Sequence, residues 1–117
     1  MTQSYVGTKQ VLAWEQEKDN QPGYAVKYQD GYVSWSPKAV FEESYLPIGH
    51  VDHLPPHQQR VIAERVQLAD KVNKLAAFFS TSMFQGLPER QKELLKFQHD
   101  AMAMYLTMLD LRIKEFE

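Results

Sequence analysis

Apolar residues in the second half of the chain recur with the period of two long helices. In the first helix, steps of four and three alternate through Val61, Arg65, Leu68, Val72, Leu75 and Phe79. In the second, steps of seven connect Leu95, Met102, Leu109 and Phe116, and the same step connects Gln98, Tyr105 and Arg112 beside them. Such columns are typical of helices that pack at a shallow angle. We therefore expect an antiparallel hairpin, with one helix from His57 to about Phe79 and a second that begins at Pro88.

Polar side chains interrupt both columns and form the first candidate binding site. The start of the first helix lies beside the end of the second in an antiparallel hairpin. Arg60 and Arg65 should therefore cluster near Tyr105 and Arg112. Several guanidiniums beside an aromatic ring suit a ligand with a phosphate and a base, since Arg forks match phosphate oxygens and a ring stacks on a purine.

The same polar residues also have a structural explanation. Arg65 can pair with a carboxylate such as Asp110 or Glu64. Polar residues inside a helical seam can also fix helix register across an oligomer interface without binding any ligand. The pattern of residues leaves both interpretations open.

The connection between the two helices is the second candidate site. Phe79 and Phe84 bring aromatic rings to a loop that also offers hydroxyl groups and, in the first turn of the second helix, Gln91. Aromatic faces and a helix N-terminus suit an anionic ligand that contains a ring. The alternative is that both phenylalanines close the core of the hairpin, as aromatic residues at helical spacing usually do.

The first half of the chain has the pattern of a small sheet with one helix. Strands are expected at residues 4–12, 24–28 and 32–35. Asp30-Gly31 is a hairpin turn signal between the last two strands. Ser36 as N-cap and Pro37 at the first helical position then mark a helix that runs to Tyr45. The expected fold class is α+β: a small antiparallel β head with one short helix, followed by a long two-helix antiparallel hairpin.

A proline-rich segment separates the two halves. Residues 46–56 contain three prolines and one glycine, a composition typical of a linker. The expected organisation is a head at 1–46, a linker at 47–56 and a helical hairpin at 57–117. His50, His53 and His57 fall in or beside this linker, where no helix holds the spacing of a metal site. We expect these histidines to be solvated.

Both helices carry apolar residues outside their main columns. These residues are Ile62, Val66 and Phe78 on the first helix and Leu94, Leu106, Met108 and Ile113 on the second. The head is too small to cover the hairpin along its whole length. A two-helix unit that is apolar on several faces should bury the excess against another chain. We therefore predict that the hairpin mediates homo-oligomerisation.

Composition narrows the classes of function. The absence of cysteine excludes disulfides, Cys-ligated zinc and thiol nucleophiles. A net charge of −2 argues against DNA or long RNA as a partner, but not against a small phosphate ligand. No signal peptide and no apolar run of membrane-spanning length is present, so we expect a soluble, cytoplasmic protein with no membrane partner. No catalytic constellation or phosphate-binding glycine loop occurs, and we expect no enzyme activity, metal or cofactor.

The order of head and hairpin resembles a known family. The segments YVGTK (Tyr5 to Lys9) and GYVSWSPKAVFEESY (Gly31 to Tyr45) are similar to an N-terminal domain of small phage-encoded proteins. The segments HQQRVIAERVQLADKVNKLAAFF and LLKFQHDAMAMYLTMLDLRI resemble the hairpin of phage anti-defence sponges. Together they resemble the Thoeris anti-defence sponge family, whose hairpin is shared with anti-CBASS sponges.

The resemblance implies a function. Members of that family bind cyclic nucleotide immune signals and hold them intact, so that the host effector is not activated. Their ligands are glycocyclic ADP-ribose isomers and, in some members, cyclic di- or trinucleotides at separate sites. They form homo-oligomers, commonly hexamers, with pockets lined by hairpin residues of neighbouring chains. The chain departs from longer relatives in the short connection that precedes Pro22-Gly23, so its range of ligands could differ.

The resemblance also ranks the candidate ligand-binding residues. By similarity, Arg112 is the first candidate phosphate ligand and Arg60 the next, and Phe79 and Phe84 are candidates for stacking a base. Gln91 is a candidate polar contact, and Arg65 and Tyr105 complete the set: Arg112, Arg60, Phe79, Phe84, Gln91, Arg65 and Tyr105.

The predicted function is a non-enzymatic phage sponge that acts in the cytoplasm of the infected bacterial cell. It is expected to block Thoeris signalling and, if it also binds cyclic di- or trinucleotides, CBASS signalling. One alternative is a structural or adaptor protein of the phage whose hairpin binds a host protein. The other is an enzyme that degrades the signal, which the missing catalytic constellation disfavours.

Overall fold

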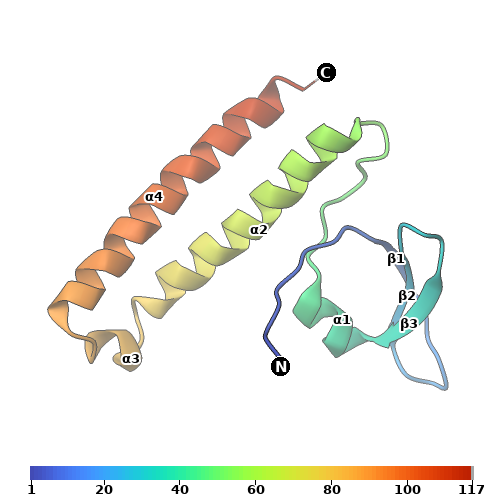
Figure 1. Cartoon of the computed structure of the whole chain (residues 1–117), viewed down its shortest axis with the longest axis horizontal. Coiled ribbons are helices and arrows are strands. Elements are labelled where there is room, and N and C mark those ends of the chain that lie inside the picture. The colour runs from blue at the N-terminus through green and yellow to red at the C-terminus, as the bar shows by residue number, and fades with distance from the viewer. Residues whose placement is uncertain (117) are drawn as a thin grey trace. The chain divides into compact units, whose positions relative to one another are not determined.

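The computed structural model describes residues 1–116, and Glu117 lies outside the described residues. The chain divides into two compact units, Met1–Leu46 and Pro47–Glu117. The first unit contains a small sheet and one helix, and the second is a helical hairpin (Figure 1). The predicted α+β class is confirmed.

The head is built on a three-stranded antiparallel sheet with the strand order β1-β2-β3. Its elements are β1 (Leu12–Glu15), β2 (Gly23–Lys27), β3 (Val33–Pro37) and α1 (Lys38–Ser44). Between β2 and β3, Gly31 has a φ of +91° and donates its amide hydrogen to the carbonyl of Tyr28 at 2.9 Å. Glycine reaches this backbone region without a steric penalty. The predicted turn at Asp30-Gly31 is confirmed.

The first strand begins later than the sequence pattern predicts. Residues 4–11 carry no regular structure, and the prediction of a strand at 4–12 was wrong except at its last residue. The cause is a tight turn at Asp19 and Asn20, whose φ angles are +52° and +65°. Lys18 and Gln21 exchange both backbone hydrogen bonds across it, at 3.0 and 2.9 Å. A two-residue turn with both φ positive fixes the register of a hairpin. In this register Leu12 lies opposite Lys27, the last residue of β2, so the residues before Leu12 extend past the end of β2.

The helix of the head begins one position later than predicted. Its N-cap is Pro37, and no side chain caps the first turn. Ser36, the predicted N-cap, is instead paired with Tyr24 in the sheet. Sheet pairing holds Ser36 in an extended conformation, so the helix starts at Lys38.

Aromatic rings connect the helix of the head to its sheet. The rings of Tyr24 on β2 and Phe41 on α1 are stacked at 4.4 Å, and Phe41 is stacked on Tyr45 at 4.7 Å. The Tyr24 hydroxyl donates a hydrogen bond to Glu42 Oε2 at 2.6 Å, and this bond to a carboxylate raises the pKa of Tyr24 above its ordinary value. The cluster of rings in the sequence of the head thus serves its packing.

The backbone of Gly23 lies so close to Trp35 and Ser36 that a substitution at this position tests the packing of the head. A Cβ atom at Gly23 would lie 2.4 Å from the Trp35 ring and 2.5 Å from the Ser36 carbonyl oxygen. The Trp35 ring also donates a hydrogen bond from Nε1 to the backbone carbonyl of Gln16 at 2.7 Å. We expect Gly23→Ala to lower the free energy of unfolding of the head by about 1–3 kcal/mol, the usual cost of overpacking. Chemical denaturation followed by tryptophan fluorescence measures the loss.

Gly7→Ala is the matched control, because a Cβ at that position meets nothing within 4 Å. Its expected change is within about 0.5 kcal/mol. Equal stabilities of the Gly23→Ala and Gly7→Ala variants would contradict the proposed contact.

The second unit is a hairpin of two long helices, α2 (Pro56–Phe78) and α4 (Glu89–Lys114), joined through the short helix α3 (Ser82–Gln85). Figure 1 shows α2 and α4 running antiparallel, with α3 in the connection between them. Both long helices were predicted and are confirmed within one or two residues at their starts. Helix α3 was not predicted. It begins where the Thr81 hydroxyl accepts a hydrogen bond from the amide of Phe84 at 3.2 Å.

The predicted apolar column of α2 agrees with the structure, whereas one of the two columns predicted for α4 does not. On α2, Val61 and Val72 are buried and the rest of the predicted column is half-buried. On α4, Leu109 is fully buried. The neighbouring column was predicted as Gln98, Tyr105 and Arg112, but these three side chains are exposed.

The column that accompanies Leu109 contains His99, Leu106 and Ile113, all half-buried. It is shifted by one residue from the predicted column. One position along a helix is a rotation of about 100°, which moves the predicted polar residues out of the seam to its solvent-exposed edge. Because they are exposed, these three side chains are not part of the packed seam between α2 and α4.

Candidate ligand-binding site

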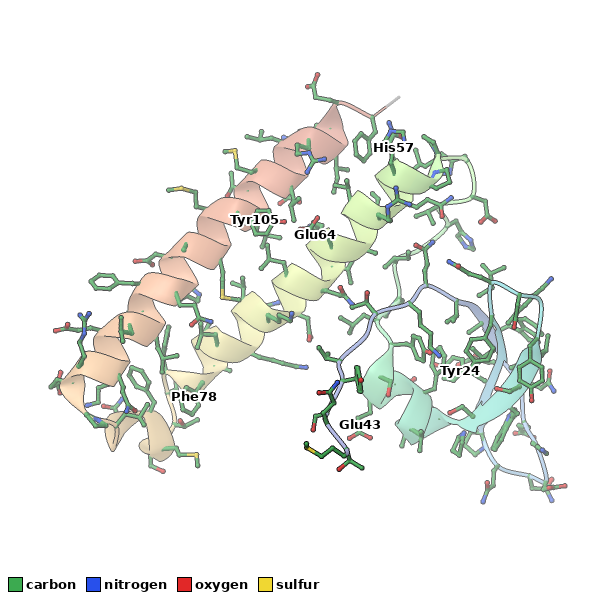
Figure 2. The ribbon with its side chains drawn as sticks, in the orientation of Figure 1. Tyr24, Glu43, His57, Glu64, Phe78 and Tyr105 are labelled. Carbon is green, nitrogen blue, oxygen red and sulfur yellow. The ribbon has the colours of Figure 1, made fainter. Side chains whose placement is uncertain are left out.

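Arginines lie near the end of the hairpin where α2 begins and α4 ends, which we call the open end. Arg60 on α2 and Arg112 on α4 are both exposed. Arg112 lies in the last turn of α4, where a positive charge interacts favourably with the helix dipole. Tyr105 is 44% exposed and lies two helical turns before Arg112 on the same side of α4. Figure 2 shows Tyr105 on α4 and His57 at the start of α2.

Arg65 makes the contact that its structural explanation required. Its Nε donates to Asp110 Oδ1 at 2.7 Å and connects α2 to α4. The two side chains are 39% and 45% exposed, so solvent screens the pair and limits its contribution to about 1 kcal/mol or less. Because its charge is partly neutralised by Asp110, Arg65 is a weaker phosphate candidate than Arg60 or Arg112.

The end of the hairpin around α3, which we call the closed end, holds the aromatic candidates. Phe84 is only 3% exposed and packs against Phe78 and Phe79, with ring centroids 5.8 and 4.9 Å away. The half-buried Phe79 also contacts the ring of His99 on α4 at 5.5 Å. The burial of Phe84 agrees with the structural alternative, in which its ring closes the core at this end of the hairpin. Figure 2 shows Phe78 at the same end of α2.

Two lysines of α4 also surround Phe84. The Nζ atoms of Lys92 and Lys96 each lie 6.0 Å from the centroid of its ring, within the range of a weak cation–π contact. The Lys92 side chain is only 17% exposed and reaches Glu89 Oε1 at 3.4 Å. Gln91, the polar candidate at this end, is exposed in the first turn of α4.

The structure separates the predicted site residues into two groups. Arg60, Arg65 and Arg112 lie at the open end, and Phe79, Phe84 and Gln91 lie at the closed end. From Gln91 to Arg112 the helix rises by about 30 Å at 1.5 Å per residue. A single hairpin therefore does not bring all the predicted residues to one small ligand.

One feature of α4 was predicted only in part from the sequence pattern. Large apolar side chains stand exposed on it at Leu94 (48%), Phe97 (62%), Met104 (70%), Met108 (50%) and Leu111 (48%). The sequence contains the pattern that predicts this face, because these residues follow alternating steps of three and four once Ala101 is included. The prediction found only Leu94 and Met108 among them.

Neither a metal cluster nor a membrane-spanning helix is found among the described residues. Among residues 1–116, no group of three or more His, Cys, Asp or Glu side chains is placed to hold a metal ion. Within the same range, no helix combines the length and apolar character needed to cross a membrane. His50, His53 and His57 are exposed.

The comparisons with known proteins concern the hairpin. The Sequestin family model matches residues 55–115, more than half of the chain. The fold and this match define an anti-defence sponge protein. The chain belongs to the Sequestin family. Neither the curated proteins nor the solved structures gave a match to it.

The family assignment confirms the general class that the resemblance implied. The chain is a sequestering anti-defence protein, and a small signalling molecule is what such a protein takes up. The match covers the hairpin and leaves the head, Met1–Leu46, outside it. The family assignment therefore rests on the hairpin and not on the head.

Proposed function

We propose that the sequestered molecule is a cyclic nucleotide immune signal, with glycocyclic ADP-ribose as the first candidate and cyclic di- or trinucleotides as the next. The observation that supports this ligand class is the pair of exposed guanidiniums at the open end, Arg60 and Arg112. Guanidinium forks bind phosphate oxygens in pairs. The exposed ring of Tyr105, on the same side of α4 as Arg112, suits a stacked base.

The proposed mechanism is sequestration without chemistry. Free signal falls when the concentration of sites exceeds that of the signal and the affinity is nanomolar, about 12 kcal/mol of binding free energy. The host effector is then not activated, and the pathways concerned are Thoeris and, for cyclic oligonucleotides, CBASS. The protein acts in the cytoplasm of the infected bacterial cell, where the signal is made. Its assembly as a homo-oligomer, commonly a hexamer in the family it resembles, stays a prediction.

The test is an uptake and release experiment. Purified protein is mixed with glycocyclic ADP-ribose or a cyclic oligonucleotide, the unbound fraction is measured after filtration, and the protein is then heated. We expect loss of the signal from solution and its return unchanged on heating. Recovery of a cleaved product would show a degrading enzyme and would contradict sequestration.

Arg112→Ala is expected to weaken uptake by about 10- to 150-fold, since a hydrogen bond to a charged group is worth about 1.5–3 kcal/mol. Isothermal titration calorimetry measures the change. Lys71→Ala is the control, because it removes one positive charge from an exposed position of α2. Equal weakening by both substitutions would mean that Arg112 contributes only its positive charge and makes no specific contact with the ligand.

A second candidate function is that of an adaptor whose hairpin binds a host protein. The exposed apolar side chains of α4 favour it, because exposed apolar patches mark interaction surfaces. Failure of the purified chain to take up any signal nucleotide would favour the adaptor.

A further inference from the structure

The sheet of the head packs on its helix with one face and leaves the other face free. Cross-strand partners lie on the same side of a sheet, so the register places Trp14, Ala25 and Trp35 side by side on one face. Tyr24 lies on the opposite face, where its ring stacks on Phe41 of α1 (Figure 2). The first face therefore points away from α1. We call it the tryptophan face, and its residues are Leu12, Trp14, Ala25, Lys27, Val33 and Trp35.

Large apolar side chains remain exposed on the tryptophan face. Leu12 is 58% exposed, Trp14 is 47% exposed and Val33 is 48% exposed. Tryptophan is enriched among the residues that dominate the energy of protein interfaces. The match to the family model covers residues 55–115 and leaves the whole head outside it. The head therefore carries an interaction surface that the family assignment does not explain.

Gln16 holds both indole rings of this face. Trp35 Nε1 donates a hydrogen bond to the Gln16 carbonyl at 2.7 Å, and Trp14 Nε1 donates to Gln16 Oε1 at 3.2 Å. The polar edge of each ring is thus satisfied within the head. The backbone groups of the strands bond to neighbouring strands in the plane of the sheet. A segment that lies across this face therefore receives ring and aliphatic contacts but no backbone hydrogen bonds.

The charge on the tryptophan face is positive. Lys27 lies on this face in the middle strand and is exposed. Lys18 Nζ lies 5.7 Å from the centroid of the Trp35 ring. Glu15, the one acidic residue of the three strands, is paired with Tyr24 and lies on the side of α1. Charge complementarity therefore favours a partner that carries carboxylates.

We propose that the tryptophan face binds a proline-rich, acidic segment of a partner protein in the polyproline II conformation. A polyproline II helix has no internal hydrogen bonds and keeps its backbone in solvent. It therefore loses little on a face that offers no backbone partners. Proline also has no amide hydrogen that could be left unpaired. Aromatic side chains are the surfaces on which proline-rich segments dock.

The dimensions of the face suit a short segment of this kind. One turn of a polyproline II helix contains three residues and rises about 9.3 Å. The three strands of the head span about 10 Å between the outer two. An acidic residue at every third position lines its carboxylates along one side of such a helix, where Lys18 and Lys27 can reach them. The two prolines of each turn are then left for the indole rings.

A peptide titration of the full chain tests the proposal. The probe is a synthetic peptide of three Pro-Pro-Glu repeats. Trp14 and Trp35 are the two tryptophans of the chain, so tryptophan fluorescence reports on this face alone. We expect a saturable change in fluorescence. Three Pro-Pro-Lys repeats keep the helix and reverse the charge, and three Gly-Ser-Glu repeats keep the charge and lose the helix; both are expected to bind at least about tenfold more weakly.

Two outcomes of this titration overturn the proposal. One is the absence of any change with the Pro-Pro-Glu peptide up to millimolar concentration. The other is equal binding of the three peptides. A change with adenosine monophosphate or with phosphatidylglycerol vesicles, and none with the Pro-Pro-Glu peptide, would likewise overturn it in favour of a nucleobase or a membrane surface.

Reversing the charge of the face tests the role of its lysines. Lys27→Glu is expected to weaken binding of the Pro-Pro-Glu peptide at least about tenfold and to strengthen binding of the Pro-Pro-Lys peptide. Lys71→Glu makes the same change of charge at an exposed position of α2, outside the head. It is expected to change neither affinity more than about twofold. Equal effects of both substitutions overturn the proposal.

This inference is independent of the proposed function, and one variant separates the two. Trp14→Ala is expected to weaken peptide binding at least about tenfold and to leave uptake of the signal nucleotide unchanged, with circular dichroism to confirm the fold. Uptake by a native chain that binds no proline-rich peptide would overturn this inference and leave sequestration standing. Peptide binding by a chain that takes up no nucleotide would support this inference and contradict the proposed ligand.

Discussion

Leu109→Ala is expected to lower the free energy of unfolding of the hairpin by about 2–5 kcal/mol. Leu109 has no exposed surface and is the most deeply buried residue of α4. The substitution removes its contacts and leaves a cavity between two helices that partly hold their positions, and both terms reduce stability. Urea denaturation followed by circular dichroism measures the loss, because α2 and α4 supply most of the helical signal.

Gln98→Ala on the same helix is the control. Gln98 is exposed, so the expected change is within about 0.5 kcal/mol. A Leu109→Ala variant as stable as this control would mean that α4 does not pack on α2 through Leu109.

Phe84→Ala is expected to cost about 3–5 kcal/mol, the range for a buried aromatic ring replaced by alanine. The Phe84 ring contacts Phe78 and Phe79, and the Nζ atoms of Lys92 and Lys96 lie within 6.0 Å of its centroid. Removing it empties the closed end of the hairpin. Thermal unfolding measures the loss, and it should appear without any ligand present.

The same substitution decides between a packing role and a ligand-stacking role for Phe84. If the ring only packs, uptake per folded molecule should stay unchanged at a temperature where the variant is folded. Met83→Ala, which truncates a side chain that is 74% exposed in the same short helix, should change neither stability nor uptake. Loss of uptake from a Phe84→Ala variant of undiminished stability would restore the stacking role.

The sequence predicted the long helices well because their signals are local. The apolar period of α2 and the prolines at the starts of both helices depend only on neighbouring residues. The Asp30-Gly31 turn was predictable for the same reason. The strand expected at 4–12 failed, because strand formation depends on a partner, and the turn at Asp19 and Asn20 placed that partner elsewhere.

The sequence predicted which residues are candidates for the binding site, but not that they lie at two opposite ends of the hairpin. Arg60 and Arg112 lie at the same end of the hairpin, near the start of α2 and the end of α4, and both are exposed. Phe84, by contrast, is buried at the other end. Aromatic residues at helical spacing carry the same signal whether they pack inside or face a ligand. The burial of Phe84 favours the packing role, and it was visible only in the tertiary structure.

The sequence by itself determined the α+β plan, the two helices and the membership of a sponge family, because each depends on residue order alone. The tertiary structure decided which side of α4 faces α2, and it replaced the column of Tyr105 and Arg112 by that of Leu106 and Ile113. The two columns lie on either side of the Leu109 column and differ by about 100° in direction. The packing of α4 on α2 therefore had to choose between them, and it left the large apolar side chains of α4 and the open-end arginines exposed.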